Sequence, residues 1–320
     1  MKLLTILCLF ILIKSNSFAD EKLKVLALEH FQPIPESLID QSKYKDLIHL
    51  GQKLFFETRL SINNKISCNT CHNLKKHGVD NQSTSVGHAG EKGGRNSPTV
   101  YNASLHIAQF WDVRAQDLEA QALGPILNPV EMGMPNAQAV VDKISNITEY
   151  KELFKKAEIE LNYVNIGKAI GAFEKTLLTP SRFDDFLKGD LKVLSELEKK
   201  GLKRFIDIGC ITCHNGPGVG GGMYMKLGVV NEYKTKDLGR YNVTKEEDDK
   251  YVFKVPSLRN IVHTGPYFHD GSIDSLDKVI PIMAHHQLGE KVSADDIKEI
   301  KAFLGSLSAK KLPSSISYLP

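Results

Sequence analysis

Two copies of one pentapeptide constrain this sequence more than any other feature. Cys68-Asn69-Thr70-Cys71-His72 and Cys210-Ile211-Thr212-Cys213-His214 both follow the pattern Cys-x-x-Cys-His. Two thiols at positions i and i+3 lie on one side of a helical turn, where both can add to the vinyl groups of a haem, and the following histidine can ligate the iron. The sequence therefore predicts two covalently attached c-type haems, held by Cys68, Cys71, His72, Cys210, Cys213 and His214.

Two other uses of these cysteines compete with haem attachment. Four cysteines could bind one zinc ion, but the halves of such a site usually lie close together in sequence, and these lie far apart. Each pair could instead be a redox-active dithiol, although no thioredoxin-like strand–helix–strand pattern surrounds either pair. The fifth cysteine, Cys8, lies in the apolar start of the chain. Once Cys8 is set aside no cysteine is left over, which favours two haems.

The start of the chain has the pattern of an export signal. Lys2 precedes an apolar run over residues 3–13, and small residues lead to Ala19. A basic start, a short apolar segment and small residues before a polar one are typical of a secretory signal peptide. The run is short for a membrane span, and Lys14 ends it, so we favour a cleaved signal over residues 1–19 to a membrane anchor. We expect no membrane span in the mature protein.

Composition and charge exclude several classes of protein. Among 320 residues, 42% are hydrophobic and 25% are charged, which is ordinary for a globular protein and excludes a fibrous or disordered chain. A formal net charge of +3 without a Lys/Arg cluster predicts no nucleic-acid partner. The run Gly220-Gly221-Gly222 lacks the Lys-Ser/Thr of a phosphate loop, which argues against nucleotide binding. We expect the neighbouring Met223 and Met225 to be loop or packing residues.

Apolar periodicity predicts a helix on the N-terminal side of each pentapeptide. Apolar residues recur at helical spacing from Leu47 to Phe55, and Ser195 forms a capping box with Glu198 at the start of a second helix. Ser293 caps a further helix with one apolar face near the C-terminus. Strand signals are sparse. The predicted fold class is therefore mostly α.

We expect two cytochrome c-like domains, each with one covalently attached haem. A helical pattern over residues 166–177 precedes Thr179-Pro180, where we place the domain junction. Residues 20–180 would form the N-terminal haem domain and residues 181–320 the C-terminal one. Both domains would carry long irregular loops, which are usually functional when they reach such lengths: residues 73–137 and 215–290.

Seven short strings, in order around both pentapeptides, carry a family resemblance over roughly residues 30–310. They are Leu54-Phe55-Phe56, Arg95-Asn96-Ser97-Pro98-Thr99, Gln109-Phe110-Trp111-Asp112, Gln121-Ala122-Leu123-Gly124-Pro125, Asn128-Pro129-Val130-Glu131-Met132, Val255-Pro256-Ser257-Leu258-Arg259-Asn260 and Pro266-Tyr267-Phe268-His269-Asp270-Gly271. The family that the chain resembles is that of the bacterial di-haem cytochrome c peroxidases.

The resemblance implies a periplasmic enzyme that reduces hydrogen peroxide to water with electrons from a small soluble donor such as cytochrome c or a copper protein. In this family the N-terminal haem is the peroxidatic one, which makes His72 its proximal ligand and His88, in a Gly-rich loop, a removable distal ligand. Glu131 would be the catalytic acid and base, with Gln121 as a neighbouring donor. Trp111 would lie between the haems as a route for electrons.

The resemblance also implies that the C-terminal haem receives the electrons. Its iron would be held by His214 and by Met283, since family members supply a methionine from a string like the one around Met283. Histidine and methionine ligation raises the potential of haem iron, which suits an electron acceptor. His285 and His286 lie next to Met283 in the sequence and are rival ligands.

Two further expectations come from the resemblance alone. The family binds a calcium ion between its domains, and the matching ligands are the side chain of Asn96 and the backbone carbonyls of Thr264 and Pro266. Oxygen ligands completed by water suit calcium. Family members are also homodimers, so we expect a homodimer here.

The residues by themselves allow more ordinary roles. Glu131 is one acid in a loop, Trp111 would serve as a core aromatic, and His88 would serve as a solvated histidine. Two other functions also stay open. One is a di-haem electron carrier without a substrate. The other is a di-haem oxidase that completes a tryptophan-derived quinone in a partner protein, although such enzymes place a tyrosine on the second iron where this chain has Met283.

Overall fold

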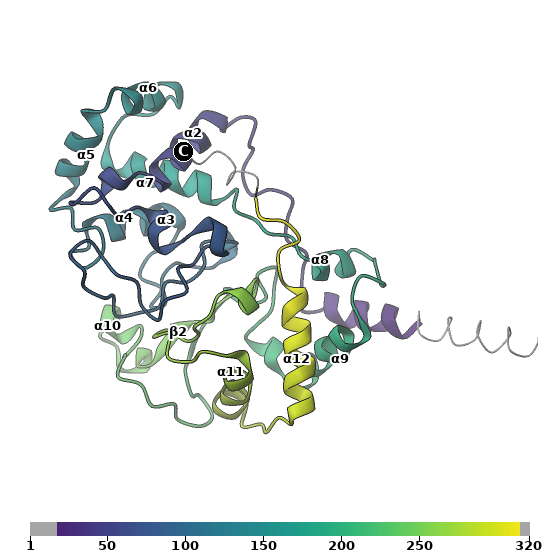
Figure 1. Cartoon of the computed structure of the whole chain (residues 1–320). Coiled ribbons are helices and arrows are strands. Elements are labelled where there is room, and N and C mark those ends of the chain that lie inside the picture. The colour runs from purple at the N-terminus through teal and green to yellow at the C-terminus, as the bar shows by residue number, and fades with distance from the viewer. Residues whose placement is uncertain (1–17, 314–320) are drawn as a thin grey trace, which may run out of the picture.

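The computed structural model describes residues 18–313, which form two lobes (Figure 1). The predicted signal peptide lies almost wholly outside the described residues. The prediction of a mostly α fold is confirmed, since the regular structure consists of helices and one two-stranded sheet. Within residues 18–313, no helix is long and apolar enough to cross a membrane.

The N-terminal lobe carries the first haem-binding pentapeptide, on the short helix α3. Its elements are α2 (Lys45–Phe55), η1 (Thr58–Leu60), α3 (Cys68–Cys71), η2 (Leu74–Lys76), η3 (Ala103–Leu105), α4 (Leu118–Leu127), α5 (Ala137–Ser145), α6 (Thr148–Lys156) and α7 (Tyr163–Glu174). Apart from the 3₁₀ turns η2 and η3, the long predicted loop after the pentapeptide is irregular until α4, and it supplies much of the wall of the cavity beside the pentapeptide.

The C-terminal lobe carries the second pentapeptide, on the 3₁₀ turn η4. Its elements are α8 (Arg182–Leu187), α9 (Glu196–Asp207), η4 (Cys210–Thr212), β1 (Tyr224–Lys226), α10 (Tyr241–Thr244), η5 (Glu247–Asp249), β2 (Val252–Lys254), η6 (Ile261–His263), α11 (Leu276–Met283), the π-helical turn η7 (Ala284–Leu288) and α12 (Ala294–Ser306). Strands β1 and β2 are antiparallel, with Tyr224 opposite Lys254.

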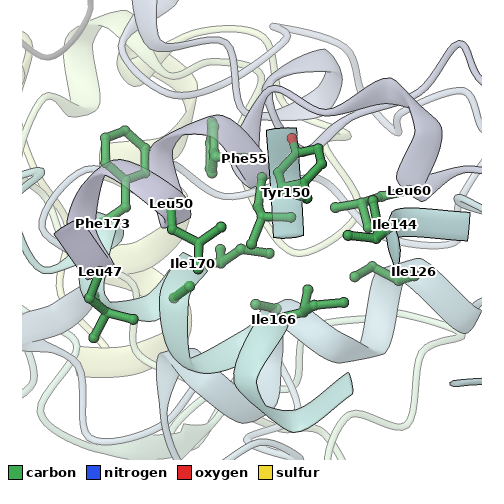
Figure 2. Close-up of a cluster of buried hydrophobic side chains, with 14 of the residues drawn as sticks. Leu47, Leu50, Phe55, Leu60, Ile126, Ile144, Tyr150, Ile166, Ile170 and Phe173 are labelled. Atoms are coloured by element: carbon green, nitrogen blue, oxygen red, sulfur yellow. The ribbon is translucent and has the colours of Figure 1, made fainter. Parts of the chain in front are cut away.

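The core of the N-terminal lobe lies where α2 crosses α7 (Figure 2). The apolar stripe predicted for α2 is confirmed, and its Leu50 faces the Ile166 and Ile170 side of α7. Phe55 and Phe173 meet edge to face, with ring centroids 5.4 Å apart. Each fully buried aliphatic or aromatic side chain of this kind contributes about 1.5–3 kcal/mol. This apolar contact fixes α2, and therefore the start of the segment that leads to the first pentapeptide.

A glycine allows the closest helix contact in each lobe. In the N-terminal lobe, a Cβ added to Gly51 of α2 would overlap the Ala169 carbonyl oxygen of α7. In the C-terminal lobe, a Cβ added to Gly201 of α9 would overlap the Glu299 carbonyl oxygen of α12. The two helix pairs therefore use the same packing solution, in which one backbone lies directly against the other.

The C-terminal core also contains a segment from the start of the described chain. Ala27 and Phe31 are buried among the phenylalanines of α8, α9 and α12. In Figure 1 the helix over residues 18–28 lies beside α9. The sequence prediction places these residues in an N-terminal domain of residues 20–180. Because their apolar side chains pack in the other lobe, we propose that the first haem domain begins after this segment.

A buried ion pair fastens that segment. Arg259, 1% exposed, donates to both carboxylate oxygens of Asp184, over 2.6 Å and 2.9 Å, and Asp184 also accepts the Ile34 backbone N–H. Burial raises the pKa of Asp184, but the charge and hydrogen bonds of Arg259 outweigh it and hold that pKa below its ordinary value. Breaking such a buried pair typically costs about 3–5 kcal/mol.

Polar side chains hold the lobes together at the predicted junction. The Thr179 hydroxyl accepts hydrogen bonds from Asn102 of one lobe (2.7 Å) and Asn260 of the other (2.9 Å). All three residues are buried, so these bonds satisfy groups that water cannot reach. The capping predictions for Ser195 and Ser293 are confirmed, with capping boxes at the starts of α9 and α12.

We predict that Gly51→Ala and Gly201→Ala each lower the free energy of unfolding by about 1–3 kcal/mol, because an added methyl group forces the helix pair apart. Gly305→Ala is the matched control, since Gly305 lies on α12 with open space around the Cβ position. Alanine there should be neutral or stabilising by up to about 1 kcal/mol. Denaturant unfolding of the holoprotein measures all three, and equal effects at the three sites would contradict the packing argument.

Candidate haem sites

The first pentapeptide lines a cavity in the N-terminal lobe. Helix α3 begins at a capping box in which the Ser67 backbone N–H donates to Thr70 Oγ1 over 3.0 Å. This short helix places Cys68, Cys71 and His72 in the cavity wall. His72 Nδ1 lies 3.0 Å from the Pro98 carbonyl oxygen, which can only accept, so the ring proton lies on Nδ1. Nε2 is then the free lone pair that a metal requires.

Two of the predicted catalytic residues line the same cavity. Gln121 reaches it from α4, and Glu131 reaches it from the loop after α4. Asn128 Nδ2 donates to Glu131 Oε1 over 2.8 Å. Burial raises the pKa of Glu131 above its ordinary value, and the charge of Arg114 and the Asn128 hydrogen bond only partly oppose that rise. A carboxyl group whose pKa is raised by burial accepts a proton more readily than an exposed one, which suits an acid and base catalyst.

His88 lies beside this cavity and does not line it. Its Nε2 lies 2.9 Å from the Pro129 carbonyl oxygen, and its backbone N–H donates to the Glu131 carbonyl over 2.8 Å. A Cβ added to Gly133, whose φ is +71°, would overlap the His88 ring. The structure therefore holds His88 against the loop that carries Glu131, and it does not bring His88 together with His72.

The second pentapeptide lines a separate, mostly apolar cavity in the C-terminal lobe. Cys210, Cys213 and His214 share its wall with Met283, which ends α11. Burial lowers the pKa of His214 to about 4, so its ring is neutral and able to ligate a metal. The other residues that line the cavity are largely apolar and include Phe205, Ile208, Leu258, Val279, Ile280 and Leu304.

The rival ligands lie outside that wall. Neither His285 nor His286 lines the cavity, and His286 Nδ1 lies 2.9 Å from the Asn231 carbonyl oxygen instead. Met225 of β1 does line it, although we expected only a loop or packing residue there. Periodicity in the sequence missed Met225 because β1 is too short to show an alternating pattern.

The two cavities share a wall that contains Trp111, the only tryptophan of the chain. The indole Nε1–H donates to the Asn96 carbonyl over 2.9 Å, and the Trp111 carbonyl accepts the Lys254 backbone N–H over 2.8 Å. His106 and Lys254 also line both cavities, and the sequence reasoning did not single out either of them.

The three residues matched to a calcium site, Asn96, Thr264 and Pro266, all line the second cavity. The Asn96 side chain donates its amide N–H to the Gln82 carbonyl over 2.9 Å. The amide oxygen is therefore the atom that a cation would use. The expected donor set of one amide oxygen and two backbone carbonyls would suit calcium.

The structure argues against the other uses of the cysteines. All four described cysteines are free, and the two pairs line different cavities. Within residues 18–313, no group of three or more His, Cys, Asp or Glu side chains could hold a metal ion. Burial raises the pKa of Cys68 and of Cys210, the latter to about 12, whereas a redox-active dithiol needs a depressed one. The geometry fits two thioether-linked haems.

One shared sequence pattern would have pointed to part of this geometry. Pro98-Thr99-Val100-Tyr101-Asn102 and Pro256-Ser257-Leu258-Arg259-Asn260 have the same spacing of proline and asparagine. In both lobes the asparagine adopts a left-handed conformation, φ +60° and +62°, and begins a 3₁₀ turn. Pro98 and Pro256 each line a cavity that contains the pentapeptide histidine. This internal repeat marks the histidine side of both sites.

Two cavities, each with a Cys-x-x-Cys-His pentapeptide in its wall, define a di-haem c-type cytochrome. A family model described as "Di-haem cytochrome c peroxidase" matches residues 45–192. Cytochrome c551 peroxidase of Pseudomonas aeruginosa is 46% identical over 303 residues, which is 91% of this chain and 87% of that protein. Cytochrome c551 peroxidase of Nitrosomonas europaea is 44% identical over 92% of this chain and 88% of that protein.

A solved structure agrees with the fold. The crystal structure of a MauG-like protein associated with microbial copper homeostasis superposes with a TM-score of 0.75, at 27% identity, over 87% of this chain and 94% of that one. The chain belongs to the di-haem cytochrome c peroxidase family and is an oxidoreductase of that family. Methylamine utilization protein MauG of Methylorubrum extorquens is 31% identical, well below the two cytochrome c551 peroxidases, so the alternative of a quinone-forming di-haem oxidase is not favoured.

Proposed function

We propose that this protein reduces hydrogen peroxide to water in the N-terminal cavity, with electrons from a small soluble cytochrome c or copper protein that enter at the C-terminal cavity. The observation that carries the proposal is the position of Glu131 and Gln121 in the wall that also contains Cys68 and His72. A bound c-type haem supplies an iron that can hold peroxide and exchange electrons. Reduction of one peroxide to two waters consumes two electrons and two protons.

Glu131 provides the proton transfer that peroxide reduction needs. Its ionised carboxylate takes the proton from the peroxide oxygen that enters first, and the resulting carboxylic acid returns it to the oxygen that leaves as water. The raised pKa of Glu131 suits both halves of this exchange, because burial makes the carboxylate a better proton acceptor than an exposed one while the acid can still return the proton. The Gln121 amide donates a hydrogen bond toward the leaving oxygen and stabilises its developing negative charge.

His88 serves as a displaceable gate in this proposal. Its loop packs on the Glu131 loop, where an added Cβ at Gly87 would overlap the Val130 carbonyl oxygen. The described position, with His88 against Pro129, leaves the distal side of the cavity to Glu131 and Gln121. In the resting oxidised protein His88 would move inward and occupy that side.

The C-terminal cavity supplies electrons. His214 and Met283 would hold its iron with one nitrogen and one thioether ligand, which favours the reduced state. Trp111 lies in the wall common to both cavities and would carry electrons between them. A simple electron carrier would need Met283 and His214 but would gain nothing from Glu131 in the other cavity.

The proposal also includes a calcium ion, a periplasmic location and a homodimer. A calcium ion on Asn96, Thr264 and Pro266 would connect the N-terminal and C-terminal lobes beside Trp111, since Asn96 also binds the indole. The exported, haem-carrying chain would act in the periplasm, where a signal peptide over residues 1–19 would send it. The family resemblance further supports a homodimer.

Turnover of the purified holoprotein tests the proposed function. The protein, reduced by one electron and loaded with calcium, should consume peroxide and oxidise a reduced small cytochrome c in the ratio of one to two. Absorption changes of the donor and a peroxide assay measure both quantities. Absence of turnover in this state would overturn the proposal and favour an electron carrier.

Glu131→Gln should lower kcat for peroxide about 10²–10⁴-fold, because an amide cannot accept and return the proton. Haem content and the binding of the donor should stay unchanged. Glu152→Gln, at an exposed position on α6, is the matched control and should leave kcat as it is. Steady-state kinetics measure the effect, and a fully active Glu131→Gln protein would assign the proton transfer to another group.

Asn128→Asp should move the acid side of the pH profile of kcat/KM to higher pH. The ionised Glu131 is the active form, so activity falls as the pH drops through its pKa, and the Asn128 hydrogen bond lowers that pKa. Aspartate keeps the oxygen that accepts the Val130 N–H but replaces the donor by a negative charge. Asn146→Asp, at an exposed position, should leave the profile in place. A shift to lower pH in Asn128→Asp would contradict this assignment.

His88→Gly should make the fully oxidised protein react with peroxide without prior reduction. The variant lacks the imidazole that would occupy the cavity beside Glu131 and Gln121. Stopped-flow spectra of the oxidised protein with peroxide measure this directly. If the variant still requires reduction before it reacts, His88 is not the gate.

A further inference from the structure

Lys254 is a buried cation without a counter-charge among the described residues. It is 5% exposed, and its ammonium group contacts two neutral acceptors, His106 Nδ1 and the Ala108 carbonyl oxygen, each at 3.1 Å. The structure gives it no carboxylate partner within residues 18–313. Burial lowers the pKa of Lys254 to about 7 in this environment. A buried ammonium group costs several kcal/mol unless an anion accompanies it.

His106 presents a second unmet requirement at the same place. An ammonium group only donates, so His106 Nδ1 accepts from Lys254 and the ring proton lies on Nε2. Nε2 is buried and has no hydrogen-bond partner in the described part of the chain. A buried donor without an acceptor costs about 1–3 kcal/mol. Lys254 lacks a negative charge and His106 lacks an acceptor, and one carboxylate would supply both.

The position of this pair is built into the fold. Both side chains line both cavities, and the backbone N–H of Lys254 is bonded to Trp111. The Ile107 backbone N–H donates to the Gly221 carbonyl over 2.9 Å, which holds the His106 segment against the glycine run. Gly221 has a φ of +81°, and a Cβ there would overlap the His106 ring. The glycine run therefore makes room for His106.

We propose that Lys254 and His106 form a carboxylate-binding site in the wall between the two cavities, and that the site takes carboxylate side chains of the bound haems. Carboxylates are the anionic groups of a haem, and this pair lines both cavities. The proposal depends on the two haems that define the family. It does not depend on the peroxidase mechanism, so loss of peroxide turnover and loss of this site are separate results.

The charge of Lys254 would also affect the reduction potential of the haems. A positive charge held near a haem favours the addition of an electron, and it acts strongly where water is excluded. Lys254 stands beside Trp111, at the place where electrons would cross between the cavities. The site would therefore raise the potential of at least one haem as well as orient it.

Redox titration of the holoprotein tests the charge. In Lys254→Met, reduction of at least one haem should become about tenfold less favourable at a fixed potential, which is a shift of about 59 mV for one electron. Lys254→Arg should restore most of the shift because it keeps the charge. Lys226→Met, on the paired strand β1 but exposed, should change neither potential. Unchanged potentials in a Lys254→Met protein that carries both haems would overturn the proposal.

Resonance Raman spectra test the hydrogen bond independently of activity. The propionate bending bands of the haems should shift in His106→Leu and stay close to their original position in His106→Gln, which keeps a donor. If the haem potentials of the wild-type protein depend on added acetate or chloride while the propionate bands of His106→Leu stay fixed, the site holds a solvent anion and the haem assignment is wrong. Should Lys254→Met fail to take up haem, a crystal structure of the unmodified holoprotein decides: haem carboxylates on other partners overturn the proposal.

Discussion

The hydrogen bond from the Lys254 backbone N–H to the Trp111 carbonyl joins the two lobes where their cavities meet. Strand β2 supplies the donor, and the irregular loop before α4 supplies the acceptor. Because this backbone bond fixes both segments, the indole, the Lys254 ammonium group and the His106 ring share one wall. Without this shared wall, no fixed set of residues would connect the two haem cavities.

In both lobes, the helix before the pentapeptide packs against its neighbouring helix in the same way. A glycine in α2 and another in α9 let a second helix lie directly on the backbone, and the pentapeptide follows each of these helices. The lobes then differ in which other residues line the cavity that contains the histidine. The C-terminal cavity presents the thioether of Met283, whereas the N-terminal cavity presents Glu131 and Gln121. That asymmetry is the physical basis for assigning electron transfer to one site and peroxide chemistry to the other.

Local sequence patterns predicted the parts of the fold that depend on neighbours in the chain. The capping boxes at Ser195 and Ser293 and the apolar stripe of α2 need only residues within one or two turns, and all three were confirmed. The domain boundary was harder to predict from the sequence, because Phe31 packs in the C-terminal core against phenylalanines more than 150 residues further along the chain. The contact between Lys254 and His106 was not predicted for the same reason, because two residues 148 positions apart form no local sequence pattern.

The sequence by itself determined the cofactor class and the chemistry of the ligands, because thioether attachment needs two cysteines and a histidine at fixed local spacing. The resemblance of the sequence to a family also implied the roles of Glu131, Gln121, Trp111 and Met283. Only the tertiary structure decided which of these residues share a cavity and that His88 lies against Pro129 beside the cavity. It also decided that Lys254 is buried in the wall between the cavities, without a counter-charge within residues 18–313. These features depend on contacts between segments that are distant in the chain. Burial and hydrogen bonding bring such segments together only when both lobes have folded.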